Sequence, residues 1–137
     1  MDSNLAVKIS PDIAKAKSLK DTATGRIEFL NRNDIDANNA NYIFEGYYSS
    51  ALEMIHAIVI IKGYKVSNHI CLGYYIRDIL KNDELYRVFD NCRFKRNSLV
   101  YYGRKMSIEI AKESIKKCIL LIEQLNVIFE DEINFKI

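Results

Sequence analysis

IEIAKESIKKCILLIEQLNVIF, residues 108–129, carries the clearest structural pattern in this sequence. Apolar residues recur in it at alternating intervals of three and four, at Ile108, Ala111, Ile115, Cys118, Ile122, Leu125 and Phe129. This spacing places them along one seam of an α-helix, and Ser107 in front of it is a good N-cap. Ile119 and Leu121 widen the seam, which favours packing in a bundle over a two-stranded coiled coil. The pattern predicts a long helix in a helical bundle.

Four more helices are predicted before this one, over about residues 10–31, 39–62, 68–80 and 84–102. Residues that cap helices well stand near their starts, with Ser10 before Pro11, Ser67 or Asn68, and Asn82 as the candidates. Gly63 and Gly103 are suited to end the second and fourth helices, because glycine adopts the left-handed conformation found there. The fold class is therefore all-α: an up-and-down four-helix bundle core with an additional short helix, about five helices in all.

The packing within this bundle is also suggested by the pattern. The second helix is apolar nearly all round in its C-terminal half, so it should be the most buried. Gly46 and Ser50, four residues apart on it, are small enough to let a neighbouring helix approach closely. The apolar stripe of the first helix is thin because Lys20 occupies one of its positions.

The length of 137 residues predicts one domain, with enough chain to form a core without disulfides or metals. We expect a flexible N-terminal arm over residues 1–9, a single helical domain over 10–129, and an acidic C-terminal tail over 130–137 that contains Glu130, Asp131 and Glu132. The net charge of +2 argues neither for nor against nucleic acid, so the local distribution of charge has to decide.

Several function classes find no support in the residues. The three cysteines form no CxxC pair, and neither a phosphate-binding glycine loop nor a GxSxG or HExxH motif is present, so no metal site and no cofactor are predicted. His56 reads as a core or interface histidine and His69 as a capping or packing residue. The longest apolar run, residues 57–61, is too short to span a bilayer, and the polar start predicts a cytoplasmic protein.

FKRNSLVYYG, residues 94–103, is the candidate functional stretch. Five cations and no acid lie between residues 91 and 105, a pattern typical either of an anion site or of a solvated helix face. The residues predicted to bind a nucleotide or RNA are Arg93, Lys95, Arg96, Asn97 and Arg104. Arg96 offers a planar fork of donors for phosphate, and Tyr101 or Tyr102 can stack on a base or donate a proton. On an ideal helix Arg96 and Tyr101 point about 140° apart, so they cannot share one flat face.

Three stretches together resemble the HEPN domain, a small helical bundle of prokaryotic defence and toxin–antitoxin systems. They are NYIFEGYYSSALEMIHAIVIIKGYKVSNH, FKRNSLVYYG and SIEIAKESIKKCILLIEQL, and the resemblance covers about residues 11–127. It implies a homodimer whose interface cleft carries an Arg and a His, separated by four to six residues, which cleave RNA without metal. Some members of the family pair with a minimal nucleotidyltransferase.

The family motif is incomplete in this chain. Arg96 matches its arginine and Asn97 its polar neighbour, but Tyr101 stands at the first position open to the histidine, and no histidine follows Arg96. The tyrosine that paired members carry two residues after the histidine is replaced by Gly103, and Tyr102 is adjacent to it rather than equivalent.

Three hypotheses follow from this departure. The first is a homodimer that binds RNA or nucleotide, or a nucleotidyltransferase partner, through a cleft at Arg96 without catalysis. The second is a weak metal-independent ribonuclease that uses Arg96 with Tyr101 or Tyr102. The third is a purely structural dimeric scaffold in which the cluster only ends a helix.

Overall fold

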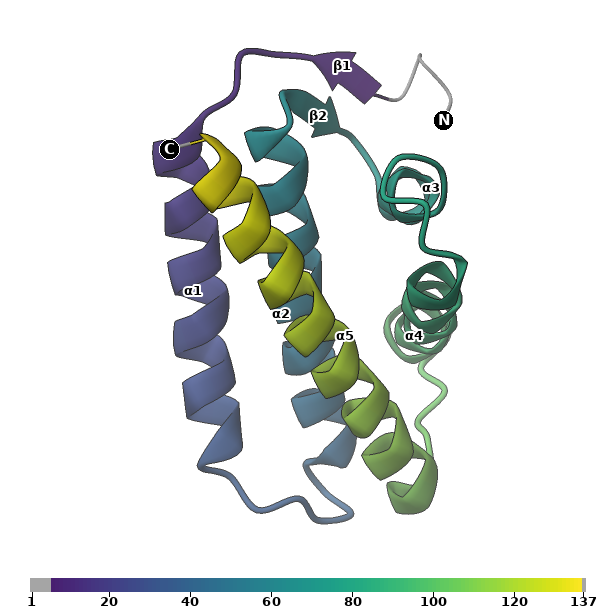
Figure 1. Ribbon diagram of the computed structural model, residues 1–137. Coiled ribbons are helices and arrows are strands. Elements are labelled where there is room, and N and C mark those ends of the chain that lie inside the picture. Colours follow the sequence, from purple (N-terminus) through teal and green to yellow (C-terminus); the bar gives the residue numbers. More distant parts are fainter. Residues whose placement is uncertain (1–5, 137) are drawn as a thin grey trace.

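The computed structural model describes residues 6–136, and an all-α bundle of five helices lies within that range, as the sequence predicts (Figure 1). The helices are α1 (Ile13–Asn31), α2 (Ala40–Ile61), α3 (His69–Asp78), α4 (Asp83–Tyr102) and α5 (Ile108–Lys136). Two three-residue strands, β1 (Ala6–Lys8) and β2 (Tyr64–Val66), form a small antiparallel sheet at one end of the bundle. The short helix is α3, which packs mainly against α4.

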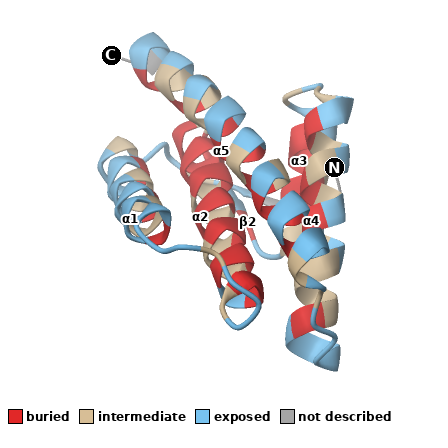
Figure 2. Ribbon diagram, turned by 90° about the horizontal axis from the view of Figure 1, so that it is seen from below, coloured by how far each residue is buried: buried red, intermediate tan, exposed pale blue. Residues whose placement is uncertain are grey.

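Helix α2 is the centre of the molecule and is buried along most of its length (Figure 2). It packs against α1 on one side and against α5, which crosses it, on the other. The largest fully buried side chains come from α2 and from the helices facing it, and include Phe44, Tyr48, Met54, Tyr75 and Phe89. The predicted burial of this helix is confirmed.

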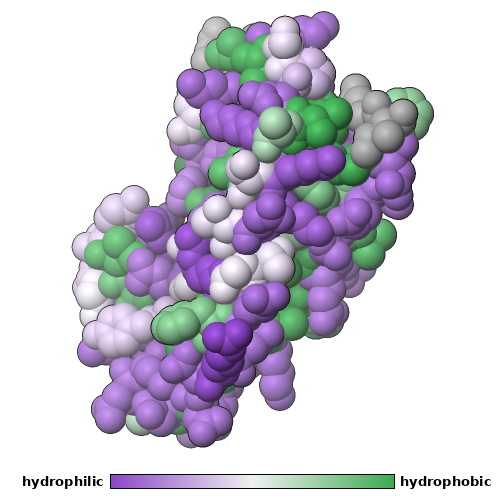
Figure 3. Space-filling model, turned by 90° about the vertical axis from the view of Figure 1, so that its left-hand side faces the viewer, coloured by the Kyte–Doolittle hydropathy of each residue, from purple (hydrophilic) through white to green (hydrophobic). Residues whose placement is uncertain are grey.

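Helix α1 contributes little to the core because its apolar stripe is thin. Its buried residues are Ala16, Ala23 and Leu30, and the face of the molecule on its side is mostly hydrophilic with small separate hydrophobic patches (Figure 3). Lys20 occupies the intervening position, where its Nζ lies 2.7 Å from Glu130 Oε1 and 5.3 Å from the centre of the Phe129 ring. Helix α1 is therefore tied to α5 by a polar contact rather than by an apolar seam.

The start of α1 differs from the sequence prediction. The helix begins at Ile13, and its N-cap is Asp12, whose carboxylate accepts a hydrogen bond from the Lys15 backbone N–H at 2.9 Å, rather than Ser10. Asp and Ser are equally good N-cap residues, so the N-cap preference of the residue type does not decide between Asp12 and Ser10. The backbone N–H of Ile9 donates to Gly63 O at 2.8 Å, which continues the strand pairing and keeps the chain extended up to the cap.

The predicted flexible arm over residues 1–9 is wrong for its last part. Residues 6–8 form β1, in which Ala6 is opposite Val66 and Lys8 is opposite Tyr64. Residues 1–5 of the predicted arm lie outside the described residues. Three residues are too few to show the alternation of a strand, and their partner strand lies nearly sixty residues away, so no local pattern indicates the pairing.

The predicted acidic tail over residues 130–137 is helical up to Lys136 and continues α5. Ile133, one turn after Phe129 on the same face, is buried, and Glu132 Oε1 lies 3.0 Å from Lys62 Nζ. Glu130 and Glu132 of this segment are thus paired with lysines of α1 and α2, whereas Asp131 is exposed. Residue 137 lies outside the described part of the chain.

Candidate functional site

A cavity of about 280 Å³ opens between the start of α3 and one face of α4. From α4 it receives Arg93, Asn97 and Tyr101, which are four residues apart and therefore lie on one helix face. The other wall is formed at the start of α3 by Ser67, Asn68, His69 and Ile70. We call this the α3–α4 cavity. It brings three of the predicted site residues together with a histidine that the sequence analysis had assigned to capping or packing.

His69 is the first residue of α3, and its imidazole contacts a residue of the core. Its Nδ1 lies 3.1 Å from the hydroxyl of Tyr48, a buried residue of α2. The pKa of His69 is lowered, first by burial and then by the positive charge of Arg96, with smaller effects of His56 and Arg93. The imidazole is therefore neutral at pH 7 and offers one donor and one acceptor nitrogen.

Arg96 lies behind the cavity rather than among the residues that line it. Its guanidinium carbon is 5.9 Å from the centre of the Tyr48 ring and 5.7 Å from that of Tyr101. Arg96 and Tyr101 point apart on the helix, as their spacing predicts, yet they meet because the long arginine side chain reaches around the helix to the tyrosine ring. Its Nε is buried and has no hydrogen-bond partner among the described residues, which leaves a donor of a cation unused.

Arg93 is the cation that lines the cavity directly. Its Nε and one terminal nitrogen lie 3.0 and 2.9 Å from Asp90 Oδ1, so the pair holds the guanidinium in place while part of its charge is neutralised. The ring of Tyr101 is 68% exposed, which makes it accessible to an aromatic ligand. The cavity thus combines a guanidinium, a neutral imidazole, an amide and an exposed phenol, which are suited to a phosphate ester with an attached base.

The other predicted site residues point elsewhere. Lys95 Nζ lies 3.1 Å from Ser114 Oγ of α5, on the opposite side of α4 from the cavity. Tyr102 and Arg104 pair with each other at the end of α4, with 5.7 Å between the guanidinium carbon and the ring centre. The ammonium nitrogen of Lys105 lies over the ring of Tyr42 of α2, also 5.7 Å from its centre. These side chains form a separate basic and aromatic surface at the joint between α4 and α5.

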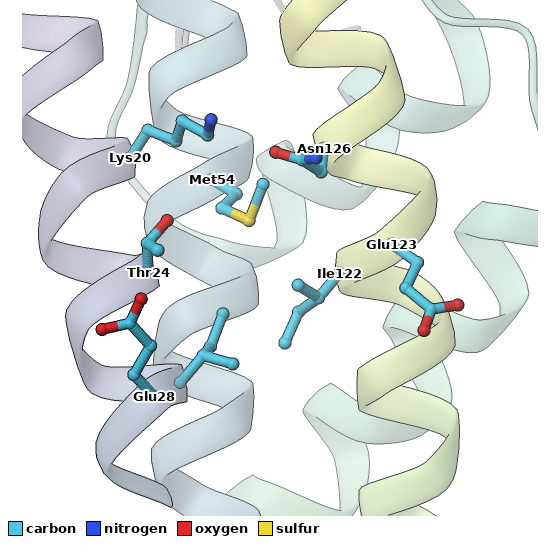
Figure 4. A pocket seen from close by; sticks show the side chains of 8 residues that line it. Lys20, Thr24, Glu28, Met54, Ile122, Glu123 and Asn126 are labelled. Carbon is cyan, nitrogen blue, oxygen red and sulfur yellow. The ribbon is translucent and has the colours of Figure 1, made fainter. Parts of the chain in front are cut away.

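A second cavity, of about 310 Å³, lies in the groove between α1 and α5 (Figure 4). Met54 of α2 lies at its centre, and Lys20 and Asn126 extend toward each other across one end of it. Glu28 and Glu123 belong to its rim, and their carboxylates point away from the centre. Because the ammonium group of Lys20 is already paired with Glu130, this groove offers mainly apolar surface and carries no charge pattern for a phosphate.

Comparisons with known proteins add no family. No family model matches the sequence, and no curated protein matches it. The HEPN resemblance, the homodimer and the nucleotidyltransferase partner therefore stay predictions. Within residues 6–136, no helix is both long and apolar enough to cross a membrane, and no three His, Cys, Asp or Glu side chains are grouped closely enough to hold a metal ion.

Proposed function

We propose that the protein binds RNA or a nucleotide through the α3–α4 cavity. The observation that carries this proposal is the convergence of His69, Arg93, Asn97 and Tyr101 on one cavity, where the guanidinium of Arg96 lies against the Tyr101 ring. These groups come from two helices, and core packing does not require the exposed Tyr101 to lie beside the others.

Each group has a role in binding such a ligand. A phosphate oxygen accepts hydrogen bonds from arginine, and a guanidinium held by a carboxylate, as Arg93 is by Asp90, loses little freedom when it binds. A base stacks on the exposed ring of Tyr101, and Asn97 beside it donates to or accepts from the base or ribose. The guanidinium of Arg96 lies against the ring of Tyr101 and contributes positive charge near the cavity.

Binding of a short oligoribonucleotide, measured by calorimetry at low salt, tests the proposal. Tyr101→Ala should weaken binding by about tenfold or more, because stacking on one base contributes roughly 1–3 kcal/mol. Arg93→Gln should weaken binding and lower its dependence on salt concentration. Arg87→Gln is the matched control, because this exposed arginine lies on the same helix and outside the cavity. Equal effects of Arg93→Gln and Arg87→Gln would show that binding depends only on overall positive charge. That result would contradict binding in the α3–α4 cavity.

A metal-independent ribonuclease is the second candidate, and the position of His69 favours it. The sequence lacks a histidine after Arg96, but the fold supplies an imidazole from another helix close enough to Arg96 for its charge to lower the histidine pKa. Of the two tyrosines proposed to act with Arg96, Tyr101 lines the cavity and Tyr102 does not. Cleavage of labelled RNA in EDTA that is lost in both His69→Gln and Arg96→Ala would support this function. Cleavage retained at full rate in both variants would exclude it.

The assembly belongs to the same proposal. We expect a homodimer, and a minimal nucleotidyltransferase as a candidate partner, from the family resemblance. Light scattering at micromolar concentration checks the dimer, and a monomer would contradict a cleft shared between two subunits. The purely structural alternative has its own signature: Arg96→Ala would lower the melting temperature and leave the affinity for RNA and nucleotide unchanged.

A further inference from the structure

Tyr48 is a core residue of α2 whose hydroxyl contacts His69, one of the residues that line the α3–α4 cavity. It is almost completely buried, and its ring stacks between Phe44 and Phe89, with centres 6.5 and 6.2 Å away. This packing fixes the position of its hydroxyl, which is the group that meets His69 Nδ1. Burial raises the pKa of Tyr48, so the hydroxyl stays protonated and can either donate to the imidazole or accept from it.

The positive charge around His69 comes from α4, whereas the groups that α2 places near it are neutral at pH 7. Helix α4 contributes Arg96 and Arg93, of which Arg93 is paired with Asp90, and α2 contributes His56 and the neutral Tyr48. The imidazole also stands in the first turn of α3, where the helix dipole disfavours a positive charge. Each of these influences, together with burial, opposes protonation of His69 in the empty cavity.

We propose that His69 takes up a proton when a phosphate-bearing ligand enters the α3–α4 cavity, and that Tyr48 is the residue that positions its imidazole for this. The inference rests on the proposed function and deepens it, because it names what regulates binding at the same site. The proton comes from the solvent, and no covalent bond is made or broken.

The physical argument follows from the arrangement of charges. A bound phosphodiester places a negative charge among Arg93, Arg96 and His69, and so offsets the positive charge that, in addition to burial, keeps the imidazole neutral. With Nδ1 held by Tyr48, Nε2 is the nitrogen that can reach the ligand. The Tyr48 hydroxyl fits both states, since it donates to an unprotonated Nδ1 and accepts from a protonated one. Ligand binding and protonation are then linked, and each strengthens the other.

Calorimetry with an oligouridylate that has no terminal phosphate tests this inference, because its phosphodiesters keep a constant charge near neutral pH. The measurement is made at about pH 6.5 in two phosphate-free buffers that differ in ionisation enthalpy, and the difference in heat gives the protons taken up. We expect a fraction of a proton per ligand, at most one. Lowering the pH should raise the affinity by up to about tenfold for each pH unit.

Three variants make the test specific. His69→Gln should abolish the proton uptake, whereas His56→Gln, which removes the other half-buried histidine outside the cavity, should keep it. Tyr48→Phe keeps the buried ring and removes only the hydroxyl, and should reduce both the affinity and the proton uptake. In the free protein, the nuclear magnetic resonance titration of His69 should shift in Tyr48→Phe, while that of His56 stays in place.

The outcomes separate this inference from the proposed function. Binding without proton uptake, or uptake that persists in His69→Gln, overturns the inference and leaves the proposed function standing. Uptake and affinity that are unchanged in Tyr48→Phe overturn the positioning role. An oligouridylate that fails to bind the wild-type protein at low salt contradicts both.

Discussion

Asn41 and Met106 hold each other through two hydrogen bonds that fix the joint between α4 and α5. Asn41 Nδ2 donates to the Met106 carbonyl at 3.1 Å, and the Met106 backbone N–H donates to Asn41 Oδ1 at 2.9 Å. Asn41 lies in the first turn of α2 and is only 5% exposed. Its side-chain amide satisfies both backbone hydrogen-bonding groups of Met106, in the segment between α4 and α5. The joint thereby sets where Tyr101 and Tyr102, at the end of α4, lie relative to α2.

Asn41→Ala is expected to lower the free energy of unfolding by about 2–3 kcal/mol, because two hydrogen bonds are lost and two backbone groups of Met106 are left without partners. Urea denaturation followed by circular dichroism measures this change. Asn38→Ala is the control, since Asn38 is exposed in the preceding loop, and it should change stability by less than about 0.5 kcal/mol. A loss of the same size in both variants would show that the joint is not specifically held.

The end of α5 provides a second prediction, because Ile133 is 6% exposed and Phe135 is 84% exposed only two residues later. Ile133→Ala should cost about 2–4 kcal/mol through lost burial and the cavity it leaves. Phe135→Ala removes a larger side chain from the surface and should be nearly neutral. Thermal and urea denaturation compare the two variants. Similar, small effects would mean that residues 130–136 do not pack on the bundle.

The helices were predictable because their signals are local. The seam of residues 108–129 has helical spacing, and Gly63 and Gly103 both adopt the positive φ expected of residues that end helices, 85° and 62°. What escaped prediction depends on partners far along the chain. The strand at residues 6–8 needs β2 to form, and Glu130 and Glu132 after Phe129 pair with lysines of α1 and α2.

The candidate site was predictable only on its α4 side. Arg93, Asn97 and Tyr101 are four residues apart, so their common face can be read from the sequence. His69 joins them only because α3 packs against α4, and no spacing in the sequence links it to Arg96. Lys95 illustrates the opposite error: it belongs to the same basic run, yet the helix turns it toward α5, where it binds Ser114.

Two helical glycines give a matched prediction about packing. A Cβ on Gly25 of α1 would meet nothing within 4 Å, so Gly25→Ala should stabilise the protein by about 0.5–1 kcal/mol through helix propensity. A Cβ on Gly46 of α2 would lie 2.9 Å from both Cδ atoms of Leu30, which is itself buried. In Gly46→Ala, the strain of moving Leu30 should cancel or exceed the stabilisation that alanine gives through helix propensity. Denaturation midpoints compare the variants, and an equal gain at both positions would contradict the close approach of α1 and α2 at Gly46.

The two histidines predict how stability depends on pH. Burial is the main cause that lowers the pKa of both His56 and His69 in the folded protein, whereas in the unfolded chain each titrates near its ordinary value of about 6.5. Between the folded and unfolded values, the unfolded chain binds more protons than the folded one, so stability rises with pH across this window. Their contribution is therefore complete above about pH 6.5 and is lost as the pH falls from there toward the folded pKa values.

Urea denaturation at several pH values between about 5 and 8, on protein without a histidine tag, measures this dependence. The double variant His56→Gln, His69→Gln should show a flatter stability profile across that range than the wild type. Each single variant should account for part of the difference, because burial lowers the pKa of each imidazole on its own helix. A wild-type profile that is already flat below pH 6.5, or one that the double variant leaves unchanged, would mean that both histidines are free to protonate in the folded state.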